Sequence, residues 1–334
     1  MNVACQCIGL TNDGGLVTYS SHYKVSWLSA LQHTIVLGSD TISPGTNTYL
    51  IGRGRQRILI DTGEGARSWA TSLKSLLSEE NATVQQVLLT HWHGDHVGGI
   101  SDLKRLCPQV IVHKHDPEEG QEDIHDGQVF CVEGATLKAC HTPGHTYDHM
   151  AFIVEEEDAL ITGDSEVPSL SCFRSLRLFG LMLIVFLRVF VDVLGQGTSV
   201  FEDLQAYLGS LQRMRTRASG RGYPGHGPVI EKVPAKISEY LQHRQQREEE
   251  VIRVLRYGSL DVEKNGGTTP EQQEKQHWTP LELVKKIYRD VPESLHLPAS
   301  HGVLQVLMKL EDEGRTVHDS TSGGWSLKAE RSAL

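Results

Sequence analysis

The sequence has few cysteines and no long hydrophobic run. Its six cysteines include no Cys-x-x-Cys pair, so they do not form the framework of a small disulfide-rich secreted protein. The longest uncharged apolar run, Leu178–Leu187, has ten residues, whereas a membrane-spanning helix needs about 20. We therefore expect no membrane partner.

Positive charge is also in short supply. The chain has 334 residues with 32 Lys+Arg against 42 Asp+Glu, a net charge of −10. This balance argues against binding by bulk attraction to nucleic-acid phosphates, although a local groove stays possible. With 39% hydrophobic and 22% charged residues, the composition is that of a globular protein. The length predicts about two domains.

Histidine is abundant, with 17 residues. Three histidines and an aspartate fall within six positions, directly after an apolar strand predicted at 84–89: His91, His93, Asp95 and His96. A loop that leaves a buried strand can aim these side chains at one point. Neutral imidazole and carboxylate suit zinc, and a mixed His/Asp set is typical of hydrolytic sites.

Three further ligand-type residues follow downstream. His145, Asp164 and His226 each lie in a glycine-containing turn, within the sequences TPGHT, TGD and YPGHG. Glycine lets the backbone turn sharply and brings such a side chain close to an ion. Each turn alone is unremarkable as a loop, but together and in this order they indicate a metal site.

Strands outnumber helices in the first 165 residues. Helices are predicted at 66–80 and 99–106, among strands at 34–38, 47–51, 57–60, 84–89, 109–112, 128–132, 135–139, 150–154 and 159–161. This mixture, with hairpins, favours two mixed sheets flanked by helices over a doubly wound parallel sheet.

The C-terminal third has a different pattern. A helix at 202–214, with Thr198 or Ser199 as its N-cap, and a long helix at 236–256 precede a polar linker at 261–277. A helix beginning at Thr279-Pro280, a second at 299–312 and a hairpin near 316–327 then outline a winged helix. Seven basic residues against eight acidic ones from Thr279 onward give no basic face, so we expect no sequence-specific DNA binding.

The motifs that contain His91, His145, Asp164 and His226, in this order along the chain, resemble those of the metallo-beta-lactamase superfamily. Within that superfamily they resemble the glyoxalase II-like group. The resemblance implies an α+β fold, the αββα sandwich, at 34–232, after a poorly specified N-terminus at 1–33 and before a C-terminal winged-helix-like helical domain at 233–334. It also implies two Zn²⁺ ions. One zinc would be held by His91, His93 and His145, the other by Asp95, His96 and His226, with Asp164 as the bridge.

Other segments narrow the resemblance to the family of beta-lactamase-like protein 2. These segments are Pro44–Leu50 (PGTNTYL), Ile60–Glu64 (IDTGE) and Thr198–Leu204 (TSVFEDL). The resemblance implies a zinc endoribonuclease that cleaves single-stranded RNA and resides in the mitochondrial matrix; a cytoplasmic location is the alternative. Asp95 would also be the catalytic residue that orients the attacking hydroxide, and Asp61 would anchor the ligand loop by hydrogen bonds.

The chain departs from this family in three places. Residues 1–43 do not match it, and an insertion at 165–193 follows Asp164, either an added surface helix or translated intron sequence. Residues 217–222 (RASGRG) read as a loop where the family has a strand before the last histidine. Two alternatives therefore stay open: a glyoxalase II-like thioesterase, and a non-catalytic RNA-binding paralogue disabled by the insertion. The oligomeric state is left open.

Overall fold

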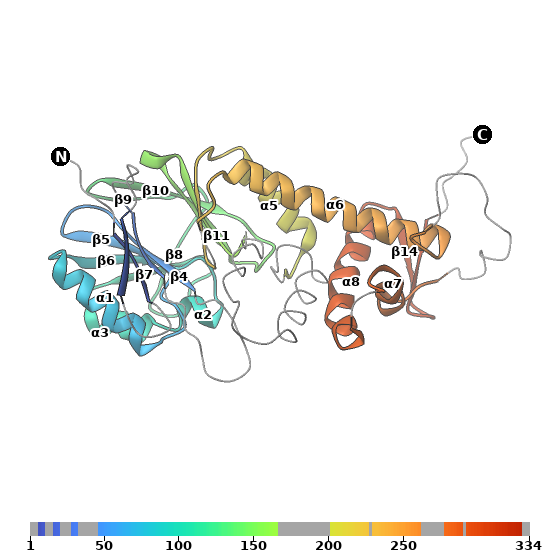
Figure 1. Cartoon of the computed structure of the whole chain (residues 1–334), viewed down its shortest axis with the longest axis horizontal. Coiled ribbons are helices and arrows are strands. Elements are labelled where there is room, and N and C mark those ends of the chain that lie inside the picture. Colours follow the sequence, from blue (N-terminus) through green and yellow to red (C-terminus); the bar gives the residue numbers. More distant parts are fainter. Residues whose placement is uncertain are drawn as a thin grey trace. The chain divides into compact units, whose positions relative to one another are not determined.

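The computed structural model describes two compact units (Figure 1). The described residues are 6–10, 16–20, 28–32, 46–165, 201–226, 229–261, 277–289 and 292–328. The first unit holds those up to 237 and the second those from 238 on. The strand predicted at 34–38, the helix caps at Thr198 and Ser199, linker residues 262–276 and insertion residues 166–193 lie outside the described residues.

The larger sheet of the first unit has the strand order β2-β1-β3-β4-β5-β6-β7-β8. Its strands are β1 (Gln6–Leu10), β2 (Leu16–Ser20), β3 (Leu28–Gln32), β4 (Asn47–Ile51), β5 (Gln56–Ile60), β6 (Thr83–Leu88), β7 (Ile111–Lys114) and β8 (Glu122–Asp123). The three N-terminal strands lie where the sequence predicted no regular element. They form because β3 pairs antiparallel with β4 and parallel with β1, which is a tertiary pairing that no local period encodes.

The smaller sheet has the strand order β13-β12-β11-β10-β9. Its strands are β9 (Val129–Val132), β10 (Ala135–His141), β11 (Met150–Val154), β12 (Ala159–Gly163) and β13 (Gly222–Pro224). The last strand corrects the prediction of a loop before His226. Residues 222–224 pair in parallel with β12, so a strand does lead into that histidine.

Two apolar layers hold the first unit together. Side chains of β4, β5, β10 and β11 form a core between the sheets, with Ile60, Leu137 and Phe152 at most 1% exposed. A second core lies between the larger sheet and the helices α1 (Arg67–Glu79) and α3 (Ile100–Leu106). Full burial of such a side chain stabilises by about 1.5–3 kcal/mol.

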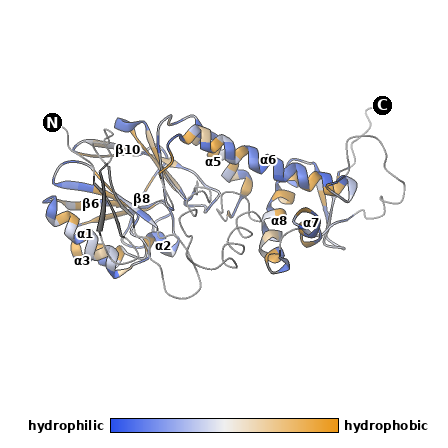
Figure 2. Ribbon diagram, viewed as in Figure 1, coloured by the Kyte–Doolittle hydropathy of each residue, from blue (hydrophilic) through white to orange (hydrophobic). Residues whose placement is uncertain are grey.

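Helices complete the predicted αββα sandwich, which the structure confirms. Hydrophobic and hydrophilic residues share α1 (Figure 2), and its buried face contains Trp69 and Leu73 as the 3.6-residue period predicted. On the smaller sheet's side, α5 (Leu204–Arg215) donates a hydrogen bond from Ser210 Oγ to the Pro143 carbonyl. The cap of α5 is Asp203.

The second unit has the predicted winged-helix order. Its elements are most of α6 (Val233–Tyr257), α7 (Pro280–Ile287), α8 (His296–Asp312), β14 (Thr316–Asp319) and β15 (Gly324–Leu327). Thr279 and Glu282 form a capping box around α7, with Pro280 in its first turn. Short 3₁₀ turns occur at Glu155–Glu157 and Glu293–Leu295. Among the described helices, none combines the length and apolar character needed to cross a bilayer.

Candidate metal centre

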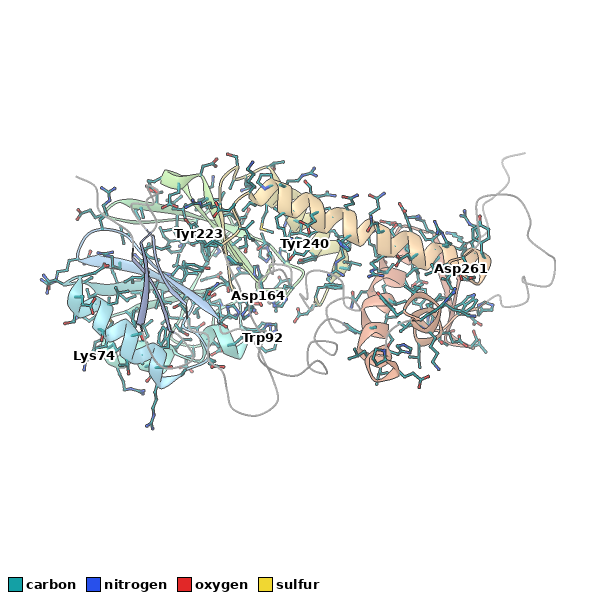
Figure 3. The ribbon with its side chains drawn as sticks, in the orientation of Figure 1. Lys74, Trp92, Asp164, Tyr223, Tyr240 and Asp261 are labelled. Carbon is teal, nitrogen blue, oxygen red and sulfur yellow. The ribbon has the colours of Figure 1, made fainter. Side chains whose placement is uncertain are left out.

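Four loops at strand ends bring the predicted site residues together. The loop after β6 enters the short helix α2 (Gly94–Val97), and its neighbours are the β10–β11 connection, the end of β12 and the end of β13. The structure places all seven predicted ligands within these loops: His91, His93, Asp95, His96, His145, Asp164 and His226. Figure 3 labels Asp164 and Trp92 at this end of the unit.

Three imidazoles, which we call the three-histidine group, meet at one point. Nε2 of His91 lies 2.9 Å from Nδ1 of His93, and Nε2 of His145 lies 3.0 Å from His93 Nδ1 and 3.3 Å from His91 Nε2. Each of these three nitrogens carries either a proton or a lone pair. At least two of them are therefore alike, and two like nitrogens cannot form a hydrogen bond with each other. A cation between the three nitrogens would accept all three lone pairs. Tetrahedral zinc with Zn–N bonds of about 2.0–2.1 Å would hold two nitrogens about 3.3 Å apart.

Asp95, His96 and His226, which we call the mixed group, form a second cluster. Asp95 Oδ2 lies 3.2 Å from His226 Nε2 and 3.5 Å from His96 Nε2. Asp164 lies between the two groups, since its Oδ1 is 3.3 Å from His96 Nε2 and its Oδ2 is 3.6 Å from His145 Nε2. A carboxylate in this position can bridge two ions.

A buried nitrogen of His96 supports metal binding at the mixed group. The His96 side chain is 0% exposed, and its Nδ1 lies 2.8 Å from Asp61 Oδ2. Its Nε2 makes no hydrogen bond within the described part of the chain. A buried polar atom without such a bond is costly, and a cation between Nε2 and the carboxylates would remove that cost. The residues therefore fit divalent metal ions that take imidazole and carboxylate ligands.

The surroundings set opposite charge states for the histidines. Burial, reinforced by the neighbouring His96, lowers the pKa of His91 well below its usual value, which keeps His91 in the neutral form that binds metals. Burial also opposes charge on His96, but the carboxylates of Asp164 and Asp61 outweigh it and raise the pKa of His96 well above its usual range. Burial likewise opposes charge on His226, but the carboxylate of Asp164 outweighs this effect and raises the pKa of His226 to about 10.

These shifts predict that metal uptake releases protons. Near neutral pH the metal-free protein holds His96 and His226 protonated, and both must lose a proton to coordinate, so uptake should release about two protons. The apparent metal affinity should therefore rise with pH through the pKa of His226, about 10. In the metal-free protein, the stability that His226 contributes through its raised pKa is fully present below about 6.5 and is lost as the pH rises through about 10.

Titration calorimetry of zinc into metal-free protein, in buffers of different ionisation enthalpy, measures this release. The observed enthalpy should change with the buffer, with a slope of about two protons. A heat that is the same in every buffer would contradict the prediction.

Asp61 fixes the loop that carries the first ligands. Its Oδ1 accepts the Thr90 N–H at 2.7 Å, and its Oδ2 accepts the Thr90 hydroxyl at 2.8 Å and faces His96 Nδ1. The residue is 1% exposed and has φ +56°, a left-handed conformation that costs a side-chain-bearing residue about 1–2 kcal/mol. These contacts are the ones that an anchor of the ligand loop would make, with the carboxylate facing an imidazole.

Replacing Asp61 by asparagine should lower metal affinity about 10–100-fold, because the amide NH₂ offers donors where Thr90 and His96 already donate. Asparagine tolerates the left-handed backbone, so the variant should fold. Competition with a chromogenic zinc chelator measures the affinity. Asp102→Asn, which alters an aspartate paired with Arg105 on α3, is the matched control and should bind metal like the parent protein. Equal affinity of both variants would exclude the anchoring role.

Residues at the start of β4 contact the site. The sequence pattern there is equally typical of a turn that leads into a strand, so it did not predict this contact. Thr46 Oγ1 donates to Asp95 Oδ2 at 3.0 Å, and the Asn47 backbone N–H donates to the Gly225 carbonyl at 2.7 Å. The phenol of Tyr49 donates to the Pro224 carbonyl at 2.6 Å. These bonds hold the loop that carries His226.

His149 is a buried support of the same site. Its Nε2 accepts the backbone N–H of Asp164 at 3.1 Å, and its Nδ1 lies 2.8 Å from the Thr142 hydroxyl. Its ring also lies 5.3 Å from the ring of His91. Burial and the nearby His145 lower the pKa of His149 well below its usual value, so its ring is neutral and Nε2 is available as the acceptor.

Family models match both units. A model described as the metallo-beta-lactamase superfamily matches residues 43–226, and one described as a beta-lactamase associated winged helix domain matches residues 279–325. The lactamase-like protein adaB of Aspergillus niger is 41% identical over 80% of this chain and 76% of its own length. The atrochrysone carboxyl ACP thioesterase of Aspergillus chevalieri is 40% identical over 84% of this chain and 80% of its own length.

Solved structures show the same fold. A beta-lactamase domain protein from Burkholderia ambifaria has a TM-score of 0.65 at 18% identity, covering 92% of this chain and 94% of its own. A metallo-beta-lactamase family protein from Thermus thermophilus has a TM-score of 0.60 at 22% identity, and the match covers 90% of this chain and 98% of its own. At these identities the likeness concerns the fold alone.

Proposed function

This chain belongs to the metallo-beta-lactamase superfamily, and on that premise we propose that it is a dinuclear zinc hydrolase that cleaves acyl thioesters. The observation that carries the proposal is the convergence of two ligand groups on Asp164. The three-histidine group would hold one ion and the mixed group the other. When bound, a pair of such ions polarises a carbonyl and makes water nucleophilic near neutral pH.

The exposure of each residue indicates its role in the reaction. His91 and His96 are fully buried, so they line the inner end of the site, away from solvent. Asp95 has a side chain 42% exposed and lies where substrate and water can reach it. Burial favours its neutral form, but His226 and His96 outweigh that effect and hold the pKa of the Asp95 carboxyl below its usual range.

Asp95 is therefore ionised at neutral pH, and its carboxylate can accept a hydrogen bond from the attacking water. Water adds to the thioester carbonyl, the carbon–sulfur bond breaks, and a carboxylic acid and a thiol result. The carboxylate of Asp95 accepts a hydrogen bond from the attacking water and orients it, and the proton that the water loses goes to the leaving sulfur. Thr46 Oγ1, which donates to Asp95 Oδ2, holds the carboxylate in this orientation.

The choice of a thioester rests on the relatives. A relative 40% identical over most of both chains is described as an ACP thioesterase, and thioester hydrolysis was already an alternative on sequence grounds. The relatives named above lend no support to the endoribonuclease prediction, to a resemblance to beta-lactamase-like protein 2, or to an RNA partner. Those predictions, the disabled RNA-binding alternative and the mitochondrial location stay predictions.

A substrate panel tests the proposal. The full chain is given an acyl thioester of N-acetylcysteamine, S-lactoylglutathione or a labelled single-stranded RNA, each before and after chelation. We expect acyl-thioester hydrolysis, followed by release of free thiol, that chelation removes and zinc restores. Asp95→Asn should lose this activity, whereas Asp102→Asn should keep it.

Other outcomes would overturn parts of the proposal. Hydrolysis that survives chelation would contradict the metal mechanism. Faster turnover of S-lactoylglutathione would favour the glyoxalase II-type alternative. Metal-dependent RNA cleavage without thioester turnover would restore the endoribonuclease prediction, and RNA binding that survives loss of metal, without cleavage, would favour the disabled paralogue.

A further inference from the structure

Two exposed aromatic side chains follow metal-ligand positions. Trp92, between His91 and His93, is 52% exposed, and Tyr147, two residues after His145, is 67% exposed. Among the described residues, Tyr257 on α6 is the other aromatic with a comparable exposed fraction, 37%. Trp and Tyr are enriched at binding surfaces, because each combines a large apolar ring with a polar group. Their placement beside the metal ligands therefore needs an explanation.

The loops that carry Trp92 and Tyr147 meet at the three-histidine group. His93 Nδ1 and His145 Nε2 lie 3.0 Å apart, which brings the two loops together directly. The Trp92 ring rests edge-on against the His93 ring, with centroids 4.6 Å apart at 66°. Trp92, labelled in Figure 3, is thereby held against His93 while its side chain stays 52% exposed.

The backbone of Tyr147 is fixed although its ring is exposed. Its N–H donates to Glu202 Oε2 at 3.0 Å, and its carbonyl oxygen lies 2.9 Å from His141 Nε2. The Tyr147 ring has looser ring neighbours, His141 at 6.1 Å and His115 at 6.3 Å between centroids. The exposed phenol is thus presented by an ordered loop, which lowers the entropy lost on binding.

We propose that Trp92 and Tyr147 form an aromatic platform that binds a planar, conjugated acyl group of the thioester substrate. This inference rests on the proposed function. A flat π-system can stack on an indole, and such aromatic contacts stabilise beyond burial alone. A saturated acyl chain gains the burial but not the stacking. The acidic net charge of −10 favours such an acyl group over the alternative planar ligand, a nucleic-acid base on a polyanionic strand.

The experiment compares 2-naphthoyl and acetyl thioesters of N-acetylcysteamine with the zinc-loaded full chain. The measured quantity is the ratio of kcat/KM for naphthoyl to that for acetyl. Trp92→Ala should lower this ratio about 10-fold, mainly through KM for the naphthoyl thioester. Tyr147→Ala should lower it by a smaller factor, and Trp92→Phe should restore most of it. Tyr257→Ala is the matched exposed-aromatic control and should leave the ratio unchanged.

Zinc content is measured for every variant, because Trp92 lies between two ligand positions. An unchanged ratio in zinc-replete Trp92→Ala would overturn the platform and leave the thioesterase proposal standing. Absence of hydrolysis of both thioesters by the parent protein would overturn the proposed function itself. Weaker cleavage or binding of single-stranded RNA in Trp92→Ala, with the thioester ratio unchanged, would assign Trp92 to base stacking and also overturn the inference.

Discussion

In the proposed dinuclear thioesterase, replacing Asp164 by asparagine should remove one of the two metal ions and lower thioester hydrolysis on the order of 10³-fold. Asp164 is buried and lies within 3.3 Å of both His96 Nε2 and His226 Nε2. The amide keeps the shape of the carboxylate but loses the charge that a bridging ligand contributes. No other carboxylate among the described residues approaches both ligand groups in this way. Elemental analysis and thiol release measure the two effects.

The same substitution should change the metal-free protein. Asp164 is the strongest cause of the raised pKa values of His96 and His226, so both pKa values should fall in Asp164→Asn. NMR titration of the histidine ring protons follows this shift. Asp102→Asn controls for the loss of an aspartate elsewhere. A variant that keeps two ions and parent-like turnover would show that Asp164 is not the bridge.

Replacing Gly225 by alanine should also disable the site, with an activity loss on the order of 10²-fold. A Cβ at this position would lie 2.3 Å from Asp164 Oδ1 and 2.9 Å from His96 Cε1. Both distances are below contact range, so the ligands must move, and misplacement by about 1 Å at a reacting centre can cost 10²-fold. Metal content should fall together with activity, whereas the thermal midpoint should change by only a few degrees.

Gly302→Ala on α8 is the matched control. A Cβ there meets no atom within 4 Å, and alanine favours a helix over glycine by about 1 kcal/mol. This variant should keep metal and activity and should gain slight stability. Gly225→Ala protein with full zinc content and normal turnover would show that the loop after β13 can yield without moving the ligands.

The sequence located the clustered histidines and aspartates because each of them marks its own position. A histidine or aspartate in a glycine turn at the end of an apolar strand is visible locally, and the ends of strands in one sandwich meet at one edge. For this reason, residues as distant as His91 and Asp164 could be assigned to one cluster. The same local logic located α1, whose buried face includes Trp69, and the capped start of α7 at Thr279.

The missed features depend on pairing between distant segments. β13 contains only Gly222, Tyr223 and Pro224 and follows an Arg/Gly-rich stretch, so its propensity is poor; its alignment beside β12 makes it a strand. Strand β3 likewise forms by pairing with β1 and β4, whereas β2 is joined to β1 as a local antiparallel hairpin. The contact of Thr46 with Asp95 crosses 49 positions, and no period in the sequence encodes it.

The hydrogen bond from Tyr49 to the Pro224 carbonyl spans 175 positions, which has a consequence for biogenesis. At about 5–20 residues per second, the ribosome needs roughly 10–35 s to make the chain between them. Until then the phenol lacks this acceptor, and a nascent chain that ended earlier would bury an unsatisfied hydroxyl at a cost of about 1–3 kcal/mol. His226 is synthesised two residues later, so we expect the mixed group to become able to bind the proposed ion only late in synthesis.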